Sequence, residues 1–269
     1  MRLLFVTYRF PAYSGDATSN TVFNLVKYFS RDHEVSLVGL APTPIPQESK
    51  DQLAQYCRRI EVVAWPKWRG ALSAARGLLS SEPLQMWYFR SKALAEKVKQ
   101  VIAEEKIEMA YGYHLRSGQF LADLDSIPRV IAIQPAQVLH FGRRYKLTRN
   151  PVLRAIYGME YRRLHGYEVN LAEKFNSCLL ISEKDRDAID PEHRLRNVFY
   201  NPTAPMCIRL PLQPMWSGKR TALYSVAQCI WIRISMRCCI SAVISCRKFG
   251  RNARRLDSRL LARDHHSRF

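Results

Sequence analysis

The sequence predicts an α/β fold, in which a Rossmann-like, doubly wound parallel sheet over residues 1–202 precedes an irregular or disordered tail. Apolar runs of strand length alternate with amphipathic helical segments up to about residue 200, which is the pattern of consecutive β-α-β units. The chain opens on such a unit, with Met1–Tyr8 (MRLLFVTY), a glycine-bearing loop and the helical run TVFNLVKYF. Ligands bind at the carboxyl ends of the strands in such sheets, so the loops after the strands are the expected site.

The first half of this domain alternates strands and helices. Asn20 is a favourable N-cap, and Val22, Leu25, Val26 and Phe29 follow at the spacing of a helix that packs on a sheet. The next predicted elements are a strand at Glu34–Leu40, a proline-rich loop at 41–50, a short helix at Asp51–Arg58 and a strand at Ile60–Ala64. The segment 65–90 mixes Trp, Arg, Gly and Leu, which predicts one short helix near 71–79 and an irregular remainder.

The second half continues the alternation. The predicted elements are a helix at Ser91–Lys106, a strand at Ile107–Gly112, a helical turn at Ser117–Leu124, a strand at Arg129–Gln134, a long helix at about 151–175, and strands at Ser177–Ile181 and Asn197–Tyr200. Asn150 followed by Pro151 is a helix-start signal. Strands that alternate with helices imply right-handed crossovers and a mostly parallel sheet.

Composition limits the function classes. The 269 residues suffice for one large domain or two small ones, and 47% hydrophobic residues support a core. A formal net charge of +19 indicates an anionic partner, either a polyanion or an anionic membrane. The sequence contains no apolar run of the roughly 18 residues that a membrane-spanning helix needs, and it does not start like a signal peptide. We therefore expect a cytoplasmic protein, with peripheral binding at the inner membrane face as an option.

The composition changes near residue 202. Residues 201–269 contain 13 Lys and Arg against two acidic residues, Asp257 and Asp264, and no Glu follows Glu192. Five of the seven cysteines fall in the same segment, and its apolar residues follow neither a helical nor a strand period. These features predict the irregular tail at 203–269.

Several spaced segments resemble one family. The opening strand followed by RFPAYSGD, the helix YRRLHGYEVNLAEKFN, and the segments SCLLISEKDRDAI and NVFYNP resemble the N-terminal domain of family 4-like GT-B glycosyltransferases. Within that family, the chain looks closest to sugar transferases of exopolysaccharide gene clusters. The resemblance covers about residues 1–202.

The resemblance implies a reaction and a missing part. Such enzymes move a sugar from a nucleotide-sugar donor to a saccharide or lipid-linked acceptor, with retention and without a metal or other cofactor. Their second domain grips the donor diphosphate with a basic pair and a Glu-x7-Glu motif, and residues 203–269 match neither. We expect a reading-frame shift near residue 202 that truncates the enzyme and leaves it nearly or fully inactive, because Arg-, Cys- and Ser-rich, Glu-free sequence is typical of a GC-rich gene read out of frame.

Substrate-binding candidates follow the predicted strands. Gly15 and Asp16 lie in the first loop and either line the acceptor site or form an ordinary turn. Tyr113 and His114 follow the fourth strand. His114 is also the candidate for a catalytic, proton-transferring residue, and the alternative is a structural histidine. Gln134 ends the fifth strand, where the family often places polar residues facing the cleft.

The remaining candidates are Ser182 and Glu183, which match the family's serine–glutamate pair. Ser182 either caps the next helix or belongs to a helix start whose N–H groups meet a phosphate. Metal ligands are not expected, since neither the histidines nor the cysteines have metal-site spacing.

Two stretches, 65–90 and 141–163, combine basic and aromatic residues. Trp and Tyr suit the membrane interface and Lys and Arg suit anionic head groups, but a solvated basic helix with core aromatics explains the pattern equally well. The alternative function is a non-enzymatic basic protein that binds an anionic membrane or nucleic acid; no specific nucleic-acid motif is present.

Overall fold

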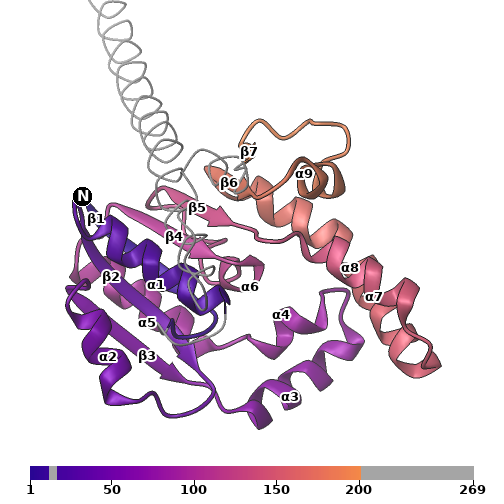
Figure 1. Ribbon diagram of the computed structural model, residues 1–269, viewed down its shortest axis with the longest axis horizontal. Coiled ribbons are helices and arrows are strands. Elements are labelled where there is room, and N and C mark those ends of the chain that lie inside the picture. Colours follow the sequence, from indigo (N-terminus) through magenta and orange to yellow (C-terminus); the bar gives the residue numbers. More distant parts are fainter. Residues whose placement is uncertain (12–16, 201–269) are drawn as a thin grey trace, which may run out of the picture. The chain divides into compact units, whose positions relative to one another are not determined.

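The computed structural model describes residues 1–11 and 17–200, which form a seven-stranded parallel sheet flanked by helices (Figure 1). In chain order the elements are β1 (Arg2–Thr7), α1 (Ala17–Phe29), β2 (Glu34–Ala41), α2 (Gln47–Ala54), β3 (Arg59–Ala64), α3 (Lys67–Arg76), the 3₁₀ turn η1 (Gly77–Leu79), α4 (Leu84–Tyr88), α5 (Lys92–Glu104), β4 (Met109–Tyr113), α6 (Leu115–Gly118), β5 (Arg129–Ala132), α7 (Gln137–Leu147), α8 (Pro151–Glu173), β6 (Ser177–Leu180), α9 (Glu183–Ile189) and β7 (Val198–Tyr200). The predicted tail at 203–269 lies outside the described residues.

The sheet order is β3-β2-β1-β4-β5-β6-β7, and every neighbouring pair is parallel. The first six strands have the order of a doubly wound Rossmann-like sheet, which confirms the predicted fold class. The chain runs outward from β1 to β3 and then returns to place β4 on the other side of β1. The order therefore reverses between β1 and β4, and ligands of such sheets bind at that point.

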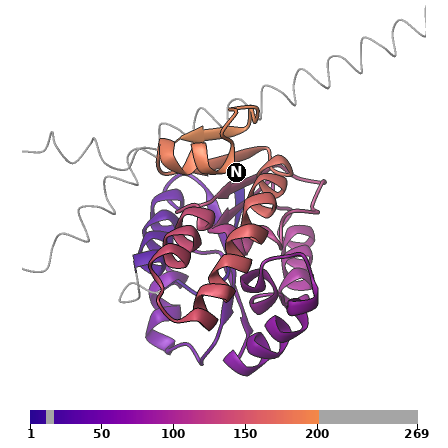
Figure 2. The same cartoon turned by 90° about the vertical axis from the view of Figure 1, so that its right-hand side faces the viewer.

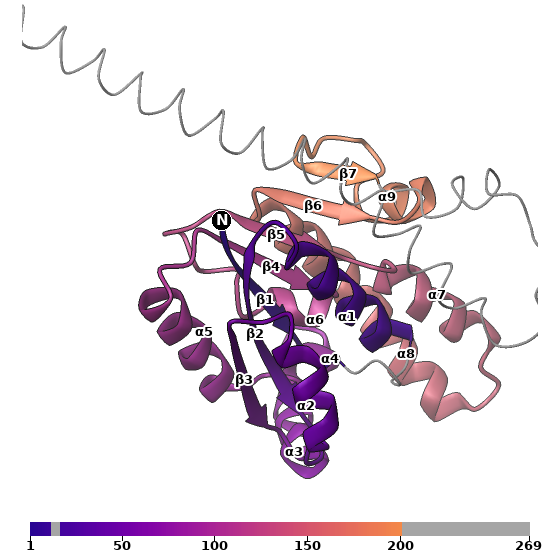
Figure 3. The same cartoon turned by 60° about the vertical axis from the view of Figure 1, so that its left-hand side comes forward.

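Helices cover both faces of the sheet (Figure 3). Successive side chains of β1 point to opposite faces. Leu4 and Val6 belong to the large core cluster with residues of α4, α5, α6 and α8, whereas the Phe5 ring lies 5.7 Å from that of Phe29 on α1. Both faces of β1 are thus fully buried, as its unbroken apolar sequence requires.

The predicted helix starts of α1 and α8 differ in their outcome. The apolar stripe of α1 is buried, but the helix begins at Ala17, so Asn20 lies inside it rather than at its N-cap. The start of α8 is as predicted: Asn150 Oδ1 accepts hydrogen bonds from the N–H groups of Val152 and Leu153, and Pro151 is the first helical residue.

Other helices differ from the predictions. α2 begins at Gln47, inside the expected loop, and α3 begins at Lys67, ahead of the expected helix near 71–79. α4 occupies a stretch that was expected to be irregular, and the short α6 precedes most of the expected turn at 117–124. α7 was not predicted at all. α4 and α6 have only 5 and 4 residues, too few to show a helical period. α3 leaves Trp68 and Leu72 exposed, so it has no buried apolar stripe that the sequence could reveal.

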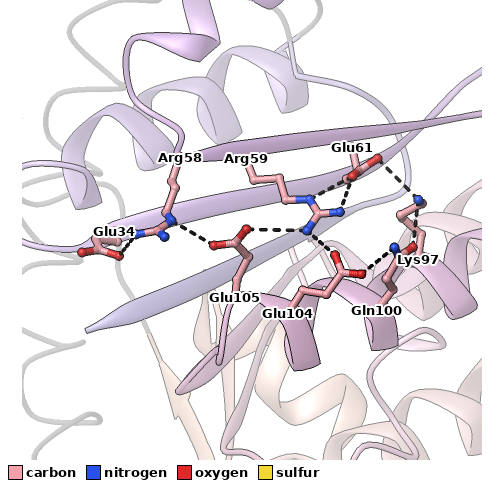
Figure 4. Close-up of polar contacts among 8 residues, drawn as sticks. All are labelled: Glu34, Arg58, Arg59, Glu61, Lys97, Gln100, Glu104 and Glu105. Carbon is pink, nitrogen blue, oxygen red and sulfur yellow. Dashed lines mark hydrogen bonds and ion pairs between the residues drawn. The ribbon is translucent and has the colours of Figure 1, made fainter.

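An ion-pair network at the amino end of β3 joins it to α5 (Figure 4). Arg59 lies 2.5 Å from Glu104 and 2.8 Å from Glu61, and the neighbouring Arg58 lies 2.9 Å from both Glu34 and Glu105. Hydrogen bonds from Gln100 and Arg59 hold the pKa of Glu104 below its ordinary value. The network lies at the opposite edge of the sheet from the expected ligand site, and we assign it a structural role.

Candidate ligand site at the carboxyl edge of the sheet

The ends of β1 and β4 bring two aromatic side chains together. Tyr8 follows β1 and His114 follows β4; both are buried, with ring centroids 4.8 Å apart. Ser117 of α6 ties the two ends, because its Oγ accepts a hydrogen bond from Tyr8 N (2.9 Å) and donates one to the Tyr113 carbonyl (2.6 Å). The reversal of strand order therefore places a fixed aromatic pair at the sheet edge where ligands of this fold bind.

His114 has an unusual backbone and a defined tautomer. Its φ of 72° and ψ of 147° lie in a region that residues other than glycine rarely adopt, and such strain concentrates at functional sites. Its Nδ1 accepts a hydrogen bond from Arg116 N at 3.3 Å, so the neutral ring carries its proton on Nε2. Burial, aided by the positive charges of Arg116 and Arg9, lowers the pKa of His114 to about 3. At neutral pH the ring is an uncharged hydrogen-bond donor and a poor proton acceptor.

Arg116 forms the second part of the site. Its guanidinium carbon lies 5.0 Å from the ring centroids of both Tyr8 and Phe89, and its Nε donates to Gln85 Oε1 at 3.0 Å. Gln85 is 8% exposed, and its Nε2 has no hydrogen-bond partner among the described residues. A buried amide group with an unused donor beside an arginine suits a polar ligand with acceptor oxygens.

α4 carries Gln85, and a carboxylate on another helix holds it in place. Glu160 of α8 accepts hydrogen bonds from Leu84 N (2.8 Å) and Gln85 N (3.0 Å), the first N–H groups of α4. Sequence reasoning missed Tyr8, Gln85, Phe89 and Arg116 as site residues. The position of Tyr8 directly after β1 was a usable signal. Gln85 and Phe89 depend on this contact between α4 and α8, and Arg116 of α6 reaches the site through its hydrogen bond with Gln85.

Tyr113 and Gln134, two of the predicted residues, meet in the fold. The Tyr113 hydroxyl lies 3.5 Å from Gln134 Oε1, and both residues are buried. Burial raises the pKa of Tyr113 to about 12, against a hydrogen bond with Thr21. The peptide bond between Gln134 and Pro135 is cis. The structure thus brings together the ends of β4 and β5, as the sequence predicted for adjacent loops.

Ser182 acts as a helix cap. Its Oγ accepts a hydrogen bond from Asp185 N (3.1 Å) and bonds to Asp185 Oδ2 (2.5 Å), while Glu183 is exposed in the first turn of α9. The capping role predicted for Ser182 is thus present in the structure. A ligand contact by Ser182 or Glu183 stays a prediction.

The N-terminus of the neighbouring helix α7 is occupied by carboxylates. Asp185 Oδ1 accepts from Ala136 N at 2.9 Å, and Glu168 accepts from Gln137 N (2.6 Å) and Val138 N (3.2 Å). Burial raises the pKa of Glu168 to about 7 against these two N–H donors, and the charge of Asp185 adds to the rise. These three N–H groups are therefore not open to a phosphate.

Gly15 and Asp16 lie outside the described residues, so their predicted acceptor contacts stay predictions.

The electrostatic surroundings of His114 are basic. The charges of Arg9, Arg116 and His140 all act on its pKa, and the pKa of His140 is itself lowered by burial and by Arg144, Arg116 and Arg143. Such a site suits an anionic or hydroxyl-rich ligand.

A cavity of about 670 Å³ lies between α8 and the segments 81–90 and 119–123, and none of the predicted residues lines it. Three of its cations are already engaged. Arg163 donates to the carbonyls of Gly77, Leu78 and Glu82, Lys174 pairs with Asp123, and Arg90 pairs with Glu82. We therefore place the candidate site at the carboxyl edge and not in this cavity.

Two features are absent from residues 1–11 and 17–200. No group of three or more His, Cys, Asp or Glu side chains there is arranged to hold a metal ion. No helix in the same part of the chain combines the length and the apolar character needed to cross a membrane.

The chain was compared with known families, curated proteins and solved structures. No protein-family model matches the sequence, and no curated protein matches it. Anabaena Alr3699/HepE in complex with UDP-glucose gives a TM-score of 0.42 at 17% identity, over 75% of this chain and 43% of that one. A putative UDP-N-acetylglucosamine 2-epimerase from Listeria monocytogenes gives 0.43 at 12% identity, over 81% and 49%. A UDP-glucosyltransferase from Polygonum tinctorium gives 0.43 at 11% identity, over 81% and 54%. The chain thus spans about half of the length of each of these structures, and at such low TM-scores the similarity supports no functional conclusion.

Proposed function

We propose that residues 1–202 are the acceptor-binding lobe of a GT-B glycosyltransferase that acts in surface polysaccharide synthesis. The complete enzyme would move a sugar from a nucleotide-sugar donor to a hydroxyl group of a saccharide or lipid-linked acceptor. The sequence resemblance and the doubly wound sheet support this proposal. The observation that carries it is the cluster of Tyr8, His114, Arg116 and Gln85 at the reversal of strand order.

The chemistry of this cluster suits a carbohydrate. A neutral imidazole with Nε2–H, an amide with an unused donor and a guanidinium offer hydrogen bonds to hydroxyl oxygens, and the Tyr8 ring adds an aromatic surface. His114 is a poor general base, since its pKa is lowered to about 3. We therefore assign His114 to acceptor binding rather than to proton transfer.

We further propose that this 269-residue chain does not catalyse sugar transfer. Residues 203–269 match neither the basic pair nor the Glu-x7-Glu motif that the family uses for the donor diphosphate. The proposed location is the cytoplasm, where nucleotide sugars are available, at the inner face of the membrane.

The test is calorimetric titration of the purified chain with a panel of neutral and acidic oligosaccharides, UDP and UDP-glucose, together with a sugar-transfer assay. We expect at least one oligosaccharide to bind, and to bind about tenfold more weakly after His114→Asn. No panel member binding, or binding indifferent to this change, contradicts the acceptor site. Transfer at roughly 1 per second or faster contradicts the proposed inactivity.

A further inference from the structure

The α7–α8 hairpin ends in an exposed tip, residues 143–156. α7 leaves the carboxyl end of β5, and the two helices run side by side away from the sheet (Figures 1 and 2). Every residue from Arg143 to Ile156 is exposed except the half-buried Thr148. The tip is thus a projecting surface without a partner in the described part of the chain.

Exposed aliphatic side chains gather at this tip. Leu147 is 81% exposed, Val152 is 67% exposed, and Leu153 and Ile156 are exposed beside them. Four such residues within ten positions form a patch, which is uncommon on the surface of a protein that contacts only water.

The same tip carries a one-sided charge. Its basic residues are Arg143, Arg144, Lys146, Arg149 and Arg154. No acidic residue occurs anywhere between Asp125 and Glu160. Cations and aliphatic side chains therefore share one surface, and no carboxylate of the tip neutralises it.

Close packing fixes the two helices. The Tyr161 ring lies against Gly142 and the Tyr145 ring against Gly158, where an added Cβ would come within 3.0 Å of the ring carbons. Arg154 lies over the Tyr145 ring at 5.3 Å. Contacts between α7 and α8 thus stabilise the hairpin, while the tip residues stay exposed.

We propose that the 143–156 tip docks the protein on an anionic membrane surface. The aliphatic side chains enter the boundary between head groups and acyl chains, and the surrounding cations meet lipid phosphates. Stable peripheral binding takes both an apolar and an electrostatic contribution, and the tip offers both. This proposal does not depend on the saccharide site and stands if no oligosaccharide binds.

Nucleic acid and a protein partner fit the tip less well. A phosphate backbone engages cations but leaves exposed Leu147, Val152 and Leu153 without favourable contacts. A helix-binding protein partner needs a groove or flat face, whereas the apolar residues here sit at the end of a projecting hairpin (Figure 3).

The experiment is co-sedimentation of the full chain with vesicles of phosphatidylcholine alone and with about 30% phosphatidylglycerol. Residues 201–269 carry their own cations, so each variant keeps them and is compared with the unmodified chain. The apolar variant is L147S/V152S, and the charge variant is K146E/R149E. The control for charge is K92E/K99E, which makes the same charge change on α5, and the control for apolar exposure is Phe199→Ser on β7, outside both basic and aromatic stretches.

We expect both tip variants to weaken partitioning into anionic vesicles about tenfold or more, and the controls to change it less than about threefold. Hydrogen exchange should slow at 143–156 when vesicles are added, and thermal melting should show that every variant folds. Equal losses in tip and control variants would overturn the proposal, since nonspecific attraction would then explain the binding. Tip variants that lose binding to a DNA duplex while keeping vesicle binding would overturn it in favour of nucleic acid.

Discussion

Tyr8 and His114 lie with their ring centroids 4.8 Å apart, each directly after one of the two strands between which the sheet order reverses. Both side chains are buried, and the Tyr8 ring also lies 5.0 Å from the Phe89 ring. The Tyr8 backbone is bonded to Ser117, and His114 Nδ1 is bonded to Arg116 N. The pair is therefore held in place at the carboxyl edge of the sheet, and its chemistry can be changed without moving the strands that carry it.

The first prediction concerns His114→Asn. Asn is a good N-cap and is enriched at positive φ, so its side-chain oxygen can keep the bond from Arg116 N while the Nε2–H donor is lost. We expect the melting temperature to change by only a few degrees, within about 1 kcal/mol, while saccharide affinity falls about tenfold. Calorimetry and thermal melting measure the two effects separately. Loss of stability and binding together would point to a structural histidine instead.

The second prediction concerns how the protonation of His114 changes the stability of the protein with pH. Its folded pKa of about 3 lies below the unfolded value of 6.5, so the unfolded chain binds more protons between these two pH values. Stability should therefore rise with pH from about 3 to 6.5, and His114→Asn should remove this contribution. NMR titration of the His114 ring between pH 5 and 8 should show the neutral form throughout. A ring that titrates near pH 6.5 would show that the site is open to water.

Glu168 has the opposite pH dependence. Its folded pKa of about 7 lies above the unfolded value of 4.5, so the folded protein holds the proton longer as pH rises. Stability should fall by about 3 kcal/mol as pH rises from 4.5 to 7, and Glu168→Gln should abolish this slope. The contributions of His114 and Glu168 to the free energy of unfolding overlap in pH and have opposite signs. Urea unfolding of the unmodified chain alone therefore does not separate them. Each is measured as the difference between a variant and the unmodified chain over the pH range.

Local sequence predicted those parts of the fold whose cause is local. Asn150 and Pro151 specify the start of α8 by their own chemistry, and the buried strands follow from unbroken apolar runs. α4 was missed because Glu160, 76 residues away from Leu84, satisfies its first N–H groups. No period in residues 84–88 could show this bond.

The site divides in the same way. The position of His114 and Gln134 at the carboxyl edge could be predicted because they follow strands, and strand ends of a parallel sheet share an edge. Arg116 and Gln85 could not, since their 3.0 Å hydrogen bond joins two short helices that tertiary contacts position. Ser182 was open to two interpretations from sequence, and the bond it accepts from Asp185 N shows its capping role.

A further prediction follows for Glu160→Ala. The change leaves the N–H groups of Leu84 and Gln85 without their acceptor, and an unsatisfied buried donor costs about 1–3 kcal/mol. Burial raises the pKa of Glu160, so Glu160→Gln, which keeps one acceptor oxygen, is the milder control. Hydrogen exchange should speed up at residues 84–89 while β1 and β4 stay protected. Unchanged exchange in α4 would show that its packing alone holds it.

The last prediction compares two glycines of α8. Gly166 lies in the helix interior, is exposed, and has open space where a Cβ would stand, so Gly166→Ala should stabilise the protein by about 1 kcal/mol through helix propensity. At Gly158 the same helix gain meets the Tyr145 ring, whose Cε2 lies 2.9 Å from an added Cβ. Tyr145 is partly exposed and can shift, but it then loses its contacts with Gly158 and Arg154, so Gly158→Ala should give no gain or a loss of about 1 kcal/mol. The melting temperatures of the two variants test this difference. Equal stabilisation by both changes would mean that the Tyr145 ring does not hold the α7–α8 hairpin together.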